Sequence, residues 1–249
     1  MDEVSRAAFV DGADLPTTAE LLGSETLGGS GRELVAALLA RDSGRVVHLI
    51  DRDPKLLEVV AADRSMLEVA VATGDIALVD VLIAKGAALD GARDGGPLVL
   101  ALHANAPGIA HALLTAGASP TPPDNPLAAF RAAIALGSAG GVRLLLDFGG
   151  DPDTRGGLDR RPLHIALDME QFGIAELLMS RGADLWAVDA GGANLGTAVT
   201  TPMVTNDPAE RDSQIRLAAR AIEAGWPDPS PTPQAIRAMS LAGAWPPKR

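Results

Sequence analysis

Four short segments of similar sequence recur along the chain, and they constrain its fold more than any other feature. The segments are VLIAKGAAL, ALLTAGASP, LLLDFGGDP and LLMSRGADL, and they place glycines at Gly86, Gly117, Gly149 and Gly182. The gaps between these glycines are 31, 32 and 33 residues. An apolar run at helical spacing precedes each glycine, and a period near 33 is typical of stacked helix pairs. We therefore predict an all-α array of repeats instead of one compact catalytic domain.

Each repeat is predicted to contain two helices. The apolar run is the second helix, and its glycine supplies the left-handed residue that commonly ends a helix. A first helix is expected about eighteen residues before each glycine, and Pro97 and Pro162 mark two of the starts. Loops rich in Gly and Asp, at 90–96 and 153–160, connect the repeats. The order within a repeat is therefore turn, helix, turn, helix.

One repeat carries a family signature. Residues 161–166 read RPLHIA, and residues 176–184 read ELLMSRGAD. This pair of segments resembles the ankyrin repeat, with Arg161 in place of the family's threonine. The other repeats are more degenerate, since Glu68, Val99 and Arg131 stand where His164 stands. The resemblance implies an ankyrin-repeat α-solenoid with short hairpin-like turns, in which His164 hydrogen-bonds neighbouring backbone.

The array is expected to cover most of the chain. Residues 31–225 are predicted to hold five repeats and a divergent sixth, with Asp53 replacing the glycine in the first. Gly225 lies 43 residues after Gly182, so about ten extra residues are expected near 200–210. Residues 1–30 are predicted to form an irregular arm or cap. Residues 226–249 are predicted to form a capping helix, from 233 to 241, and a tail.

Composition and charge exclude several functions. Aromatic residues make up 3% of the chain and cysteine is absent, which suits closely packed helices and excludes disulfides and thiolate chemistry. The net charge is −11, and acidic residues outnumber basic ones by 12 to 7 over 1–64 and by 15 to 8 over 65–190. This balance argues against nucleic-acid binding. It fits either general solubility or selection of a basic partner.

The N-terminal sequence, the short apolar runs and the amino-acid composition suggest a cellular location and a type of source organism. The N-terminus is acidic where a signal peptide needs a basic start, and no run approaches the length of a membrane span. We expect a cytoplasmic protein that does not bind membranes. The bias toward Ala, Gly, Asp and Arg suggests a GC-rich bacterial gene.

The residues do not assemble a catalytic or metal-binding motif. His103 and His111 are eight residues apart, but Pro107 and Gly108 should interrupt a helix between them. The sequence contains no nucleophile elbow, phosphate loop or His-Glu-x-x-His segment. The paired Asp151 and Asp153 follow a helix end and are read as part of a turn. We expect no metal, no cofactor and no enzymatic activity, since an enzyme would need a further domain.

The resemblance implies a binding surface at the turn tips and along the first helices. Mapped onto this sequence, the candidate partner-binding residues are Asp90, Arg93, Asp94, Asp124, Asn125, Asp153, Arg155, Asp159, Arg160, Trp186 and Asp189. Trp186 stands where the family usually has asparagine. It is either an exposed anchor for a partner or a residue packed under the 200–210 insertion.

The predicted function is protein–protein interaction by a monomeric, non-enzymatic module. Two roles fit such an array: an adaptor within a complex, or an inhibitor or immunity-type protein that masks a basic toxin or enzyme. The acidic surface favours a basic target in the second case. The sequence does not identify the partner.

Overall fold

The computed structural model describes residues 16–90 and 96–247, and most of these residues are helical. Contacts divide the chain into two compact units, residues 1–132 and 133–249. The boundary falls inside helix α9 (Ala128–Ala135). Repeat arrays can divide in this way because each repeat contacts only its neighbours. The two units are described separately.

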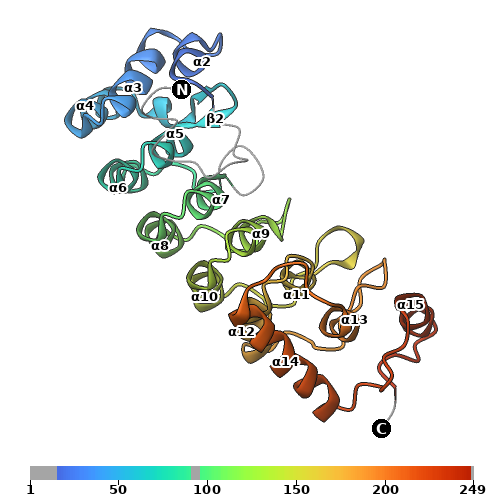
Figure 1. The fold of residues 1–249 in the computed structure, drawn as a ribbon. Coiled ribbons are helices and arrows are strands. Elements are labelled where there is room, and N and C mark those ends of the chain that lie inside the picture. The colour runs from blue at the N-terminus through green and yellow to red at the C-terminus, as the bar shows by residue number, and fades with distance from the viewer. Residues whose placement is uncertain (1–15, 91–95, 248–249) are drawn as a thin grey trace. The chain divides into compact units, whose positions relative to one another are not determined.

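The N-terminal unit contains three helix pairs in two layers (Figure 1). The pairs are α3 (Gly29–Leu39) with α4 (Ser43–Arg52), α5 (Met66–Ala72) with α6 (Ile76–Ala84), and α7 (Gly96–His103) with α8 (Pro107–Ala116). The first helices α3, α5 and α7 pack side by side, and so do the second helices α4, α6 and α8. This arrangement is the predicted stack of helix pairs.

Short elements precede and connect these pairs. Helix α2 (Thr18–Gly23) packs on α3, and its Thr17 and Glu20 form a reciprocal capping box. The 3-10 helix η1 (Pro54–Glu58) and the antiparallel strands β1 (Val60–Ala61) and β2 (Arg64–Ser65) join the first pair to the second. Helix α2 lies within the region predicted to be an arm or cap. Residues 1–15 of that region lie outside the described residues, and the predicted division of the chain remains a prediction.

The C-terminal unit continues the same pattern. Its helices are α10 (Ala139–Asp147), α11 (Pro162–Asp168), α12 (Phe172–Ser180), α13 (Leu195–Thr200), α14 (Pro208–Glu223) and α15 (Pro233–Leu241), with a 3-10 turn η2 (Gly157–Asp159) before α11. Helices α11 and α12 pair, as do α13 and α14, while α10, α12 and α14 pack in sequence. The predicted helix at 233–241 is confirmed as α15.

The core of each unit is built from aliphatic side chains and alanine. Leu34, Leu78 and Leu82 are fully buried in the first unit, and Leu145 and Leu178 are fully buried in the second. Alanine contributes no side-chain bulk, so its presence at many core positions lets the helices approach closely. The chain therefore fills its core with very few aromatic rings.

Left-handed residues end the second helices as predicted. Gly86, Gly117, Gly149 and Gly182 have φ of 88°, 105°, 86° and 98°. A second series of left-handed residues lies in five of the connections between a first helix and a second helix: Arg41, Gly74, Asn105, Gly137 and Glu170, with φ from 49° to 70°. The sequence did not reveal this second series because only two of its members are glycine.

The extra residues of the sixth repeat are divided between a loop and a helix. The connection from α13 to α14 spans residues 201–207, whereas the matching connection from α11 to α12 spans only 169–171. Helix α14 has 16 residues, against nine in α12. The insertion predicted near 200–210 is thus only partly a loop, because residues 208–210 form the first turn of α14.

The predicted role of His164 is confirmed. Its Nδ1 accepts a hydrogen bond of 3.1 Å from the backbone N–H of Arg161, which caps the start of α11. Glu68 does the same for α5, since its carboxylate accepts from the N–H of Ser65 at 2.9 Å. Burial is the main cause that lowers the pKa of His164, and the carbonyl of Ala187 opposes it. The imidazole is therefore a neutral structural group.

Candidate protein-binding surface

The turn that precedes α11 is anchored by an ion-pair network around the side chain of Arg161. The guanidinium of Arg161 pairs with Asp153 at 3.0 Å and with Asp184 at 3.2 Å, and the Asp184 N–H donates to the Asp153 carboxylate at 3.1 Å. Arg161 is buried. The departure from the family's threonine thus ties this turn to the next repeat. Asp153, expected at a binding tip, has its carboxylate committed to this network.

The outer part of this turn, residues 155–160, projects as a finger. Arg155 and Asp159 form an exposed ion pair of 2.8 Å, and the N–H of Gly156 donates to the carbonyl of Arg160 at 2.9 Å. Arg160 pairs with Asp168 at the end of α11. The structure therefore brings three of the predicted surface residues together, namely Arg155, Asp159 and Arg160.

Leu158 at the finger tip was missed by the sequence reasoning. It is 74% exposed, and both Leu158 and Asp159 adopt left-handed φ, of 60° and 57°. The β1–β2 hairpin, 96 residues earlier, uses Ala62 and Asp63 in the same conformation. Because alanine serves in that turn, the conformation does not require a leucine. The sequence signal that could have identified Leu158 is a large apolar residue within a loop of Gly, Asp and Arg.

Trp186 packs against the C-terminal segment. Its ring stacks on Trp226, with centroids 4.9 Å apart and planes within 5°. Trp245 meets both rings edge-on, at 5.5 and 5.0 Å, and its Nε1 donates to the Trp186 carbonyl at 3.0 Å. All three tryptophans of the chain form this cluster. Trp186 is only partly exposed, so we leave it out of the proposed surface.

The other candidate residues are dispersed. Asp189 is 8% exposed, and its carboxylate accepts from the N–H groups of Gly191 and Ala193, so it shapes a turn. Asp90 is exposed and accepts from the Ser119 N–H at 3.2 Å. Asp124 is exposed and Asn125 is half-buried, and both belong to the N-terminal unit. Arg93 and Asp94 lie outside the described residues.

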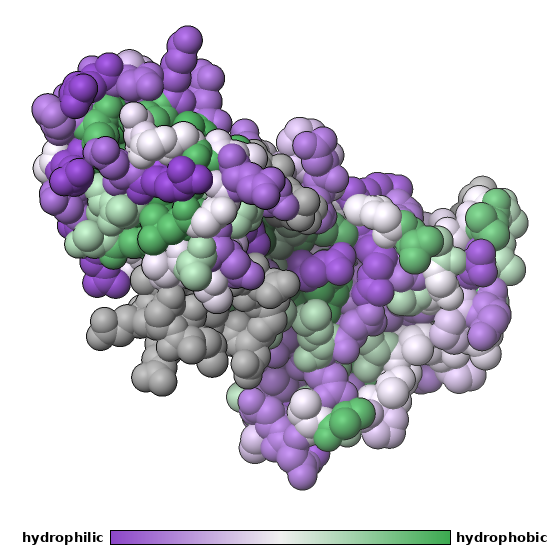
Figure 2. All heavy atoms as spheres, turned by 90° about the horizontal axis from the view of Figure 1, so that it is seen from above, coloured by the Kyte–Doolittle hydropathy of each residue, from purple (hydrophilic) through white to green (hydrophobic). Residues whose placement is uncertain are grey.

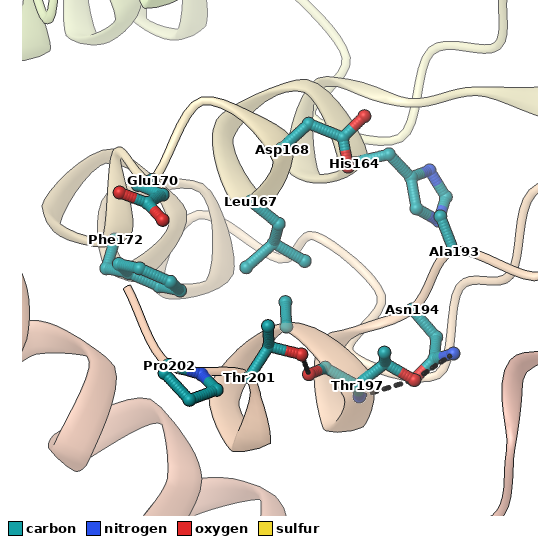
Figure 3. Close-up of a pocket in the computed structure, with 11 residues that line it drawn as sticks. His164, Leu167, Asp168, Glu170, Phe172, Ala193, Asn194, Thr197, Thr201 and Pro202 are labelled. Atoms are coloured by element: carbon teal, nitrogen blue, oxygen red, sulfur yellow. Dashed lines mark hydrogen bonds between the residues drawn. The ribbon is translucent and has the colours of Figure 1, made fainter. Parts of the chain in front are cut away.

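A cavity of about 250 Å³ lies between α11 and α13. Leu167 of α11 points toward Thr197 of α13 and toward Thr201, which follows that helix, while Glu170 and Phe172 stand at one end of the space (Figure 3). The lining residues are His164, Leu167, Asp168, Glu170, Phe172, Ala193, Asn194, Thr197, Ala198, Thr201 and Pro202. The sequence reasoning singled out none of these residues as a ligand-binding group.

The hydropathy of the face drawn in Figure 2, clusters of metal ligands and membrane spans concern other kinds of site. On the face drawn in Figure 2, apolar residues appear as small groups separated by hydrophilic ones. Across residues 16–90 and 96–247, no three or more His, Asp or Glu side chains gather as metal ligands. Within the same ranges, no helix has the length and apolar character that a bilayer crossing demands.

The stacked helix pairs, the periodic left-handed glycines and the finger turns define an ankyrin-repeat fold. The family model described as "Ankyrin repeat" matches residues 159–190. Among solved structures, the crystal structure of the human ASB11 ankyrin repeat domain is similar, at 19% sequence identity and a TM-score of 0.59. The match covers 75% of this chain and 82% of that chain. No curated protein matches the sequence.

These comparisons establish the class of the molecule. The chain carries an ankyrin repeat at residues 159–190 and has the fold of an ankyrin-repeat domain. Ankyrin repeats are generally protein–protein interaction modules, and the fold is typically a non-enzymatic scaffold. The identity to the solved structure is low, so that likeness describes the fold alone.

Proposed function

We propose that this protein is a non-enzymatic binding module that holds a protein partner through its turn tips and first helices. The observation that carries the proposal is the exposed Leu158 at the tip of the 155–160 finger. The proposed surface of the C-terminal unit comprises Leu158, Arg155, Asp159 and Arg160. Asp90, Asp124 and Asn125 are separate candidates in the N-terminal unit. It is proposed to act as a cytoplasmic monomer without a cofactor.

The finger has the properties of an interaction anchor. Burying a leucine side chain in a partner's apolar pocket contributes about 1.5–3 kcal/mol. Arg155 and Asp159 surround this apolar group with charge, which resembles the polar rim of an interface.

Inhibition of a basic toxin or enzyme is the second candidate function. The observation in its favour is the net charge of −11, which would accelerate association with a basic protein and keep the chain soluble. An adaptor role does not depend on this charge. The salt dependence of the association rate separates the two, because only an electrostatically steered complex forms much more slowly at high salt.

The proposal is tested by partner capture with Leu158→Ala. This change installs the residue that the other hairpin uses at the same turn position, so the melting temperature should be unchanged. Capture from an extract of the native cell should fall about tenfold or more, as expected when an anchor worth about 1.5–3 kcal/mol is lost. Leu241→Ala is the control, since Leu241 is 80% exposed in the same unit but lies at the end of α15. If Leu158→Ala captures as much partner as the control variant does, the proposal is refuted.

A further inference from the structure

We propose that the cavity between α11 and α13 receives a lysine or arginine side chain of the protein partner. This inference rests on the proposed function and adds the chemistry of one contact to it. Three features of the cavity support it: its size, its apolar walls and the carboxylates of Asp168 and Glu170 in its lining.

The size of the cavity suits one side chain. Pockets for free small ligands measure about 300–1,000 Å³. This cavity measures about 250 Å³, below that range. It lies along the first helices, and it is bounded by α11, by α13 and by the start of the loop at Thr201 and Pro202 (Figure 3). A residue projecting from a partner bound on these helices would therefore fill it.

The walls match the stem of a long basic side chain. Leu167, Phe172, Ala198 and Pro202 supply apolar surface around the space. Lysine and arginine bury their methylene stems on such surface while the charged head stays among polar groups. A short polar side chain would leave these walls uncovered, so the apolar lining favours an occupant with a stem.

Carboxylates stand where the charged head would lie. Asp168 ends α11, and Glu170 follows it in the turn to α12. The Glu170 carboxylate accepts from the N–H groups of Val204 at 2.6 Å and Thr205 at 2.8 Å, and these bonds lower its pKa. Arg160 pairs with Asp168 alone. The carboxylates of Asp168 and Glu170 and the guanidinium of Arg160 therefore sum to one net negative charge at the cavity.

The polar groups in the wall include several acceptors and one buried donor, since Nε2 of His164 has no hydrogen-bond partner among the described residues. The side-chain amide of Asn194 donates to the carbonyl of Gly192 and to Thr197 Oγ1. The hydroxyl of Thr201 donates to the carbonyl of Thr197, which leaves its own lone pairs for another donor. An ammonium or guanidinium supplies such donors.

Binding of model side chains to the whole chain tests the inference directly. The probes are N-acetyl-lysine methylamide and N-acetyl-arginine methylamide, with the norleucine analogue as an uncharged match and the glutamate analogue as an anion. Amide chemical shifts of Leu167, Thr197 and Ala198 should change saturably with the two cationic probes. Their affinity should exceed that of norleucine at least fivefold, and salt should weaken it. Equal binding of norleucine, or no saturable change with any probe, would overturn the inference.

Two variants connect the cavity to partner binding. Ala198→Phe should fill the space and abolish the probe shifts, while Ala219→Phe on the exposed side of α14 should leave them unchanged. Asp168→Asn should weaken only the cationic probes, by a few fold. If Ala198→Phe captures the partner as well as the unmodified chain, the cavity inference fails. The Leu158→Ala result would still decide the proposed function, so the two failures can be told apart.

Discussion

Gly196→Ala is predicted to disrupt the tryptophan cluster of the C-terminal unit. Gly196 lies in α13 against the Trp226 indole, and an added Cβ would overlap Nε1 and Cε2 of that ring and stand 2.6 Å from Cζ2. Either the ring or the helix must move. Since Trp226 contacts both Trp186 and Trp245, movement of its ring would break two aromatic pairs at once.

The magnitude follows from those two pairs. Each aromatic pair contributes about 0.5–1.5 kcal/mol beyond its buried area, so losing both costs about 1–3 kcal/mol. Alanine is favoured over glycine inside a helix by up to about 1 kcal/mol, which offsets part of this loss. We expect a net decrease of about 1–2 kcal/mol in the free energy of unfolding.

Fluorescence and near-ultraviolet circular dichroism provide the assay, because every tryptophan of the chain belongs to the cluster. The dichroism signal of the stacked rings should weaken, and the emission should shift to longer wavelength. Gly140→Ala is the control: Gly140 lies in α10 with nothing within 4 Å of an added Cβ, so alanine there should stabilise slightly. An unchanged tryptophan spectrum and unchanged stability in Gly196→Ala would refute the reasoning.

Three further predictions concern the stack, its pH dependence and its longest connection. Leu145→Ala should lower the free energy of unfolding in denaturant by about 2–5 kcal/mol, because Leu145 is completely buried. Leu144→Ala should lower it less, because Leu144 is half-buried. The pKa of His164 lies below its ordinary value of 6.5, so its contribution to stability is complete above about pH 6.5 and is lost as pH falls through the folded pKa. His164→Gln should reduce this loss in unfolding curves measured between pH 7 and 5. Deleting residues 202–205 shortens the 201–207 connection to three residues, as in 169–171, and should leave the helical circular dichroism unchanged; a collapse of the helical signal would contradict the placement of the insertion.

The sequence by itself determined the repeat, the helix pairs and where the helices end. These features depend on interactions within a few residues: a left-handed glycine satisfies the last carbonyls of its own helix, and proline starts α11 and α15 with a preset φ. His164 could be placed for the same reason, since its Nδ1 caps a backbone N–H only three residues away. The one family signature lay in the repeat where these local rules are followed most closely.

Only the tertiary structure decided which surface groups remain available for binding. Asp153 and Asp189 looked like exposed tip residues, but Arg161 and two backbone N–H groups engage their carboxylates. The ring of Trp186 contacts those of Trp226 and Trp245, which lie 40 and 59 residues later in the sequence. The cavity between α11 and α13 likewise depends on how two successive first helices pack. Such contacts depend on the path of the chain through space, and a local sequence pattern carries no record of that path.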